Sequence, residues 1–270
     1  MLAEVAPQNG RVLAGGQSLV PAMAFRAALP GHLVDINGVV ELAHLAADAA
    51  VLSIGACTRH AAFHRPVADG PLGPLLSSVV RHIAHYPIRT RGTFCGSVAN
   101  ADPASEWCLV AATLGATMVA RSTRGTRRIG AAEFFGGIMS TALADDEILT
   151  ETHLPLLVAG TRYGFYEFSR RAGDFAIAMA LVAYRVEGGV ITEPRIGVGA
   201  VEDRPRRIAE AEAILRDEAP GAELFRAASE VAAEAVDPID ATPDGQEYKR
   251  DVVRAAVRRA LERAQGTAHD

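Results

Sequence analysis

The sequence predicts an α+β protein built in two parts. Up to about residue 159, short apolar strands alternate with helical runs and with two glycine-bearing turns. Beyond residue 160 the order changes, because three strands, the last two joined by Glu187-Gly188-Gly189, precede three helical runs. No G-x-G-x-x-G motif opens a strand–helix–strand unit, so a Rossmann fold is not predicted.

In the first part, apolar runs bounded by turn residues define the elements. Residues 11–14 form a strand that ends at Gly15-Gly16, and Ser18 can cap a helix that Pro30-Gly31 ends. Further strands are expected at 32–36, 51–56, 116–120, 126–129 and 147–155, helical or buried apolar segments at 58–63, 75–84 and 107–114, and a loop at 134–137.

The second part predicts helices that pack on one face of a sheet, since its strands come before its helices. The strands are expected at 163–169, 175–186 and 191–200, and the helices at 208–216, 223–235 and 246–264.

Composition excludes several classes of function. The net charge of −5 argues against nucleic acid as a partner, and we interpret the basic residues at 121–128 and in the last helix as solvated surface. Lys249, the only lysine, lies in a charged helical run, so neither a Schiff base nor a Walker-A site has a plausible residue.

Cysteine usage and hydropathy favour a soluble cytoplasmic protein. Cys57, Cys95 and Cys108 form no C-x-x-C pair and are too few for a four-thiolate iron–sulfur site. Their odd number does not suit a disulfide framework. Neither a signal peptide nor a membrane span is predicted.

Two glycine-bearing turns are the best candidates for a ligand site. The first comprises Ala14, Gly15, Gly16, Gln17 and Ser18, and the second, within 91–97, comprises Thr93, Phe94, Cys95, Gly96 and Ser97. Such turns can surround a phosphate with main-chain N–H groups. Either turn alone is more simply an ordinary glycine turn, but together they favour a dinucleotide held between them.

Other polar residues give weaker signals. Glu106 and Asp102 could accept from ribose hydroxyls, or could equally be acids at a helix start. The His60/His64 and His82/His85 spacings suit a metal, but no third ligand is evident and no metal site is predicted. No catalytic nucleophile or acid–base pair stands out, so the chemistry must come from a bound cofactor.

Four ordered motifs carry a resemblance to a known family. Residues 11–25 (RVLAGGQSLVPAMAF) and 88–106 (IRTRGTFCGSVANADPASE) resemble the FAD-binding medium subunit of the molybdenum hydroxylases. The similarity continues through DEILTETHLP, FYEFSRRAGDFAIA and EYKRDVVRAAVRRAL. Carbon monoxide dehydrogenase and bacterial dehydrogenases of purines and other N-heterocycles belong to this family, whose flavin domain resembles that of xanthine dehydrogenase.

The resemblance implies a vanillyl-alcohol-oxidase (PCMH)-type FAD-binding domain at 1–159, with subdomains at about 1–50 and 51–159. A C-terminal α+β domain of the carbon monoxide dehydrogenase flavoprotein type would cover 160–270. The two glycine-bearing turns would hold the FAD pyrophosphate. Glu106 would be an acidic FAD contact, and Leu149 would touch the isoalloxazine edge.

The implied function is that of an oxidoreductase subunit in a heterotrimer. It would take electrons from a small subunit with two [2Fe–2S] clusters, which drains a molybdopterin-binding large subunit, and pass them to an external acceptor. The whole enzyme would hydroxylate a small molecule such as an N-heterocycle, as a dimer of heterotrimers. Alternatives are a stand-alone flavin oxidoreductase and a flavin-free assembly subunit.

Four departures from the family pattern carry expectations of their own. Phe94 and Cys95 replace the isoleucine and first glycine of a T-I-G-G turn, and this turn is expected to survive. Gln17 stands where relatives often carry histidine, so FAD is expected to bind non-covalently. Glu167, expected among the cofactor-binding residues, stands where relatives often show a lysine near the flavin, and a carboxylate there would disfavour negative charge on reduced flavin. Only ten residues precede Arg11, so the first subdomain's edge is expected to be incomplete.

Overall fold

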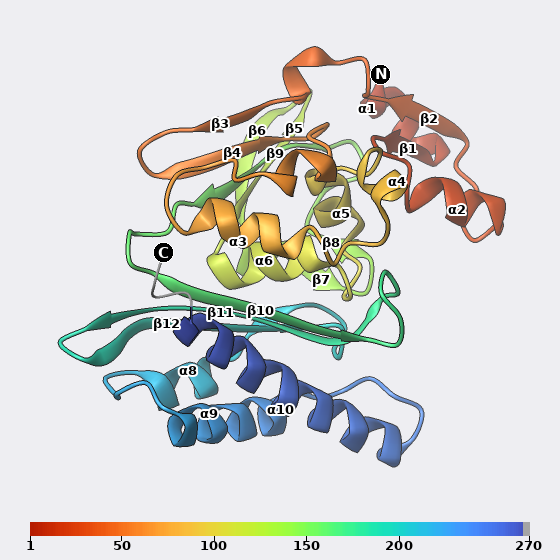
Figure 1. Cartoon of the computed structure of the whole chain (residues 1–270). Coiled ribbons are helices and arrows are strands. Elements are labelled where there is room, and N and C mark those ends of the chain that lie inside the picture. The colour runs from red at the N-terminus through yellow and green to blue at the C-terminus, as the bar shows by residue number, and fades with distance from the viewer. Residues whose placement is uncertain (267–270) are drawn as a thin grey trace.

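A four-stranded antiparallel sheet separates two layers of the molecule (Figure 1). The computed structural model describes residues 1–266. Helix α6 lies on one face of this sheet with the rest of the N-terminal part behind it, and α8, α9 and α10 cover the other face. This arrangement confirms the predicted α+β class.

A small parallel sheet lies next to the first glycine-bearing turn, which directly follows its strand β1. Strand β1 (Gly10–Leu13) pairs with β2 (His32–Asp35), and α2 (Leu19–Ala24) connects them. The helix is shorter than predicted, because Arg26 already adopts a positive φ of 57°. Short helices and one short strand precede or follow this sheet: α1 (Leu2–Val5), η1 (Ala6–Gln8), η2 (Val40–Leu42) and β3 (Leu45–Ala47).

A five-stranded antiparallel sheet in the order β3-β4-β9-β5-β6 forms the centre of the N-terminal part. Its other strands are β4 (Val51–Gly55), β5 (Thr117–Ser122), β6 (Gly125–Gly130) and β9 (Ile148–Pro155). The helices beside it are η3 (His60–His64), α3 (Leu72–Val79), α4 (Tyr86–Arg89), α5 (Phe94–Asn100) and α6 (Glu106–Leu114). These helices bury Phe63, Phe94 and Trp107, whose rings lie within 6 Å of one another.

Two predictions in this part were wrong. The stretch at 134–137 is not a loop, since α7 (Ala131–Phe134), β7 (Phe135–Gly137) and β8 (Ser140–Thr141) form there. The side chains of Phe134 and Phe135 are both buried, and their rings pack edge to face with centroids 5.3 Å apart. The second glycine-bearing turn also differs from the prediction. Helix α5 begins at Phe94, so residues 94–97 of the predicted turn are the first residues of a helix.

The C-terminal part consists of β10 (Arg162–Ser169), β11 (Ala176–Glu187), β12 (Val190–Gly199) and β13 (Arg206–Arg207), followed by three helices. Their bounds are α8 (Ala209–Leu215), α9 (Ala222–Ala235) and α10 (Pro243–Gly266). Side chains of β11 alternate between two cores. Met179 and Leu181 join the core of the N-terminal part, and Ala180 and Val182 join the core under the helices.

Candidate functional site

The two glycine-bearing turns lie in direct contact. A Cβ atom on Gly15 would be 2.4 Å from the Arg91 carbonyl oxygen and 2.6 Å from Gly92 Cα. These atoms are backbone and cannot rotate away, so only glycine permits this approach. Gly16 adopts a positive φ of 74°, which other residues rarely adopt. The fold therefore brings together the two segments that the sequence singled out.

The first turn presents a row of main-chain donors. The N–H groups of Gly15, Gly16, Gln17 and Ser18 donate no hydrogen bond to any residue among 1–266. The Gln17 side chain is directed back to the Gly15 carbonyl at 3.1 Å. In a folded protein such donors are normally paired or face solvent or a ligand, so the turn can bind an anion.

The second turn is held rigidly by its own helix cap. Thr93 Oγ1 accepts from the Gly96 N–H at 3.0 Å, which caps α5. The Phe94 N–H donates to the Thr58 carbonyl at 3.0 Å, and this fixes the turn against the segment that precedes η3. Ser97 lies one turn into α5, so its hydroxyl is farther along the helix than a simple loop would place it.

Asn37 and Arg59 support both turns, and sequence reasoning did not select them. Asn37 Nδ2 donates to the Ala14 carbonyl at 2.7 Å, and Asn37 Oδ1 accepts from Arg59 at 2.6 Å. The Arg59 guanidinium also hydrogen-bonds the Arg91 carbonyl. One amide and one guanidinium thus connect the two turns. Asn37-Gly38 after a strand is an ordinary turn signal, so the sequence offered little hint of this role.

His60 serves a structural role beneath the second turn. Trp107 Nε1 donates to His60 Nδ1 at 2.9 Å, and the His60 N–H donates to the Gly92 carbonyl at 3.0 Å. Burial lowers the pKa of His60 to about 3, so the imidazole is neutral at physiological pH. His64 instead accepts from Arg89 at 3.1 Å. Within residues 1–266, no group of three or more potential metal ligands occurs.

Cys95, on α5, is buried against β4 and β9. Its thiol lies 3.3 Å from both the Ile54 carbonyl and Thr152 Oγ1. Burial raises the pKa of Cys95 to about 12, so the thiol stays protonated and unreactive. Leu149, on the same strand β9, is 5% exposed and belongs to the core. Its predicted contact with the flavin edge stays a prediction.

Glu106 and Glu167 come from different parts of the chain and influence each other. Glu106 begins α6, and burial followed by repulsion from Asp102 raises its pKa to about 7. Glu167 lies on β10, where burial and the nearby Glu106 raise its pKa to about 8. Its side chain is only 3% exposed. With its pKa raised to about 8, Glu167 is mainly the uncharged acid at neutral pH, and the repulsion of reduced flavin expected from a carboxylate stays a prediction for higher pH.

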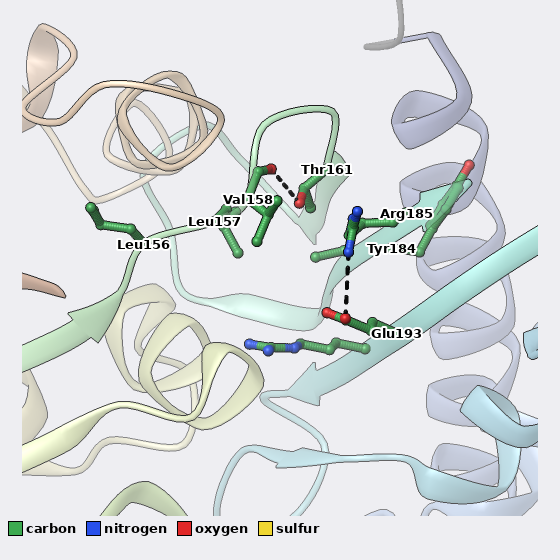
Figure 2. Close-up of a pocket in the computed structure, with 9 residues that line it drawn as sticks. Leu156, Leu157, Val158, Thr161, Tyr184, Arg185 and Glu193 are labelled. Atoms are coloured by element: carbon green, nitrogen blue, oxygen red, sulfur yellow. Dashed lines mark hydrogen bonds and ion pairs between the residues drawn. The ribbon is translucent and has the colours of Figure 1, made fainter. Parts of the chain in front are cut away.

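A small pocket lies elsewhere, at the connection between β9 and β10 (Figure 2). It measures about 40 Å³, room for a water or two, and is far smaller than a cofactor site. Its lining residues are Leu156, Leu157, Val158, Thr161, Ala183, Tyr184, Arg185, Glu193 and Arg195. None of them belongs to the two glycine-bearing turns, and we assign it no function.

Comparison with known proteins decides the family. A family model described as the FAD binding domain in molybdopterin dehydrogenase matches residues 1–157, and one described as the CO dehydrogenase flavoprotein C-terminal domain matches residues 163–264. The chain belongs to the FAD-binding medium subunits of the molybdenum hydroxylases. The resemblance drawn from its motifs is therefore confirmed.

Individual medium subunits are similar along nearly their whole length. The nicotine 6-hydroxylase medium subunit of Paenarthrobacter nicotinovorans is 35% identical over 94% of this chain and 89% of the relative. In solved structures, carbon monoxide dehydrogenase from Hydrogenophaga pseudoflava matches with a TM-score of 0.91 at 31% identity, over 98% of this chain and 94% of the other. Quinoline 2-oxidoreductase from Pseudomonas putida 86 gives 0.89 at 34%, over 99% and 93%.

Membership in this family establishes the broad function. The chain is an FAD-binding, electron-transferring subunit of an oxidoreductase, and the molybdopterin and [2Fe–2S] groups lie on a large and a small partner subunit. No helix within residues 1–266 is long and apolar enough to cross a membrane.

Proposed function

We propose that this medium subunit holds FAD non-covalently, with the cofactor's pyrophosphate between the turns at 14–18 and 93–97. The contact of Gly15 with Arg91 and Gly92 is the observation that carries this proposal. The unpaired N–H groups from Gly15 to Ser18 fit a diphosphate, whereas at the start of α5 the N–H groups of Phe94, Gly96 and Ser97 are already paired within the protein. When bound, FAD supplies two-electron and one-electron redox chemistry, and the chain supplies binding and orientation.

Non-covalent attachment follows from the side chain at position 17. Gln17 is an amide whose nitrogen is directed to the Gly15 carbonyl, and an amide nitrogen is not nucleophilic enough to form a covalent bond to the flavin. Acid precipitation should therefore release the flavin into the supernatant. Yellow colour that stays with the pellet would contradict this part of the proposal.

A comparison of two flavins tests the pyrophosphate site directly. FMN carries the same ring as FAD but lacks the diphosphate bridge and the adenosine. Apoprotein titrated with each should bind FAD at least about 100-fold more tightly, since two or more charge-assisted hydrogen bonds are lost with FMN. Equal affinities would remove the basis for placing the pyrophosphate at these turns.

We further propose that the whole enzyme is a cytoplasmic dimer of heterotrimers and that it hydroxylates a small N-heterocycle. Within this subunit, we propose a domain boundary at 159/160. Support for the substrate class comes from relatives named for nicotine and quinoline. Purification from the native host should yield iron and molybdenum together with this chain, and turnover with an N-heterocycle tests the substrate class. An active flavoprotein free of both metals would instead support a stand-alone oxidoreductase.

A further inference from the structure

A buried carboxyl group lies between the N-terminal part and the sheet of the C-terminal part. Glu167 lies on β10, on the same face as Phe165, and Phe165 belongs to the core of the N-terminal part. Among residues 1–266, Glu167 Oε2 is buried without a hydrogen-bond partner. An ionised carboxylate in this position would lack the pairing that normally compensates its burial.

The charged and titratable groups around Glu167 come from each element that faces it. His82, in the segment after α3, places Nδ1 3.8 Å from Glu167 Oε2, which is too long for a hydrogen bond. Its ring packs edge-on against Phe165 at 5.0 Å. On the acidic side, Glu106 of α6 repels a charge on Glu167, and Asp102 in turn repels a charge on Glu106.

The cations nearby do not compensate this charge. Arg263 of α10 donates to the main-chain carbonyl of Phe165 at 2.6 Å and not to the Glu167 carboxyl group. Burial and the charge of Arg263 both lower the pKa of His82, which disfavours an imidazolium beside Glu167. With acids on one side and a neutral imidazole on the other, Glu167 is most stable when protonated.

We propose that Glu167 is a proton-binding group of the folded chain, that it lies close enough to the bound flavin for its protonation to be coupled to flavin reduction, and that the part-exposed His82 is its route to solvent. This inference rests on the proposed function. When bound, FAD would supply the two-electron redox chemistry, with electrons from the [2Fe–2S] clusters of the partner subunit. If Glu167 is ionised when the site is reduced, its carboxylate takes up one proton from water and becomes the neutral acid, in addition to any proton that the cofactor would take up.

The full-length apoprotein gives the first test, which needs no flavin. A carboxyl whose pKa is higher in the folded than in the unfolded state binds more protons when folded, so its contribution to stability is lost as pH rises through that window. For Glu167 the window extends from about 4.5 to about 8. The folding equilibrium constant of the wild type should therefore fall relative to that of Glu167→Gln by up to about tenfold per pH unit.

Exposed Glu133 provides a matched control. Glu133→Gln should keep the pH profile of the wild type in urea unfolding. If Glu167→Gln also keeps that profile, Glu167 is not a proton-binding group of the folded chain and the proposal is overturned. If Glu106→Gln removes the pH dependence while Glu167→Gln does not, the assignment to Glu167 is likewise wrong.

The second test measures the midpoint potential of bound FAD from pH 7 to pH 10. A two-electron reduction that takes up one proton shifts the potential by about 30 mV per pH unit, and uptake of two protons shifts it by about 59 mV. The wild type should change from the shallow to the steep slope above about pH 8, and Glu167→Gln should keep the shallow slope throughout. A wild-type slope without such a change would overturn the proposal.

The two tests separate this inference from the proposed function. Wild-type apoprotein that fails to bind FAD contradicts the FAD site but leaves the unfolding test of Glu167 intact. Should Glu167→Gln load FAD poorly, Glu167→Asp retains a carboxyl and should restore the steep slope, although at a shifted pH. A Glu167→Asp protein with the shallow slope would count against the proposal.

Discussion

The contact between the two glycine-bearing turns makes Gly15→Ala a sharp test of the site. The new methyl carbon would lie 2.4 Å from the Arg91 carbonyl oxygen, whereas ordinary contacts begin at 3.4 Å. The turns must therefore separate by about 1 Å, enough to lengthen a 2.9 Å hydrogen bond beyond its useful range. Loss of one charge-assisted bond to the pyrophosphate costs about 2 kcal/mol, which corresponds to about 30-fold weaker FAD binding.

Isothermal titration of apoprotein with FAD measures this effect. Gly38→Ala is the matched control, because its added Cβ meets nothing within 4 Å and it lies in the same region of the chain. The control should bind FAD as the wild type does. Wild-type affinity in Gly15→Ala would show that the cofactor does not depend on the close approach of these turns, and the placement of the pyrophosphate would have to be abandoned.

Three further predictions concern the support of the site and the contact between layers. Thr93→Ala removes the α5 cap and should lower stability by about 1 kcal/mol and Tm by about 2–4 °C in a thermal melt, while Thr93→Ser should retain both. Because folded His60 has a pKa of about 3, the unfolded chain binds more protons below pH 6.5; the wild type should lose about 2 kcal/mol between pH 6.5 and 5 from this residue, and His60→Gln should lack that loss in urea unfolding. Gly164→Ala would place Cβ 1.9 Å from the Ala260 carbonyl oxygen of α10 and should cost about 1–3 kcal/mol by the same measurement, with Gly130→Ala, whose Cβ meets nothing, as the control; equal stability of these two variants would contradict the close approach of α10 to β10.

Local patterns were enough to predict most strands and the long C-terminal helices. Runs rich in apolar or β-branched residues and bounded by Gly, Pro or Asp predict β4, β5 and β9 to within two residues, and the Ser122–Gly125 turn predicts β6 as the partner of β5. The segment at 134–137 failed for the opposite reason. Its two glycines indicated a loop, but the burial of Phe134 and Phe135 against distant residues determined the structure.

The candidate site was predictable only at positions where the residue type itself indicates the backbone conformation. Gly15 and Gly16 gave such a signal, since glycine marks tight or left-handed backbone. Asn37 and Arg59 gave none, because their role depends on the spatial meeting of β2 with η3. His60 and Glu167 likewise owe their protonation to burial, which requires the packed structure. The family resemblance identified the cofactor as FAD, where local chemistry indicated only a dinucleotide.

Strand β11 constrains the length of the chain, because both of its faces are buried. Its odd-numbered side chains from Met179 to Ala183 serve one core and its even-numbered side chains from Ala178 to Tyr184 serve the other. Deleting a single codon near the start of this strand would exchange the two sets, so that Ala180 and Val182 would take the places of Met179 and Leu181. Insertions and deletions here should therefore be tolerated far less than conservative substitutions. A substitution changes one side chain, whereas a one-residue shift moves every following side chain of the strand to the opposite core.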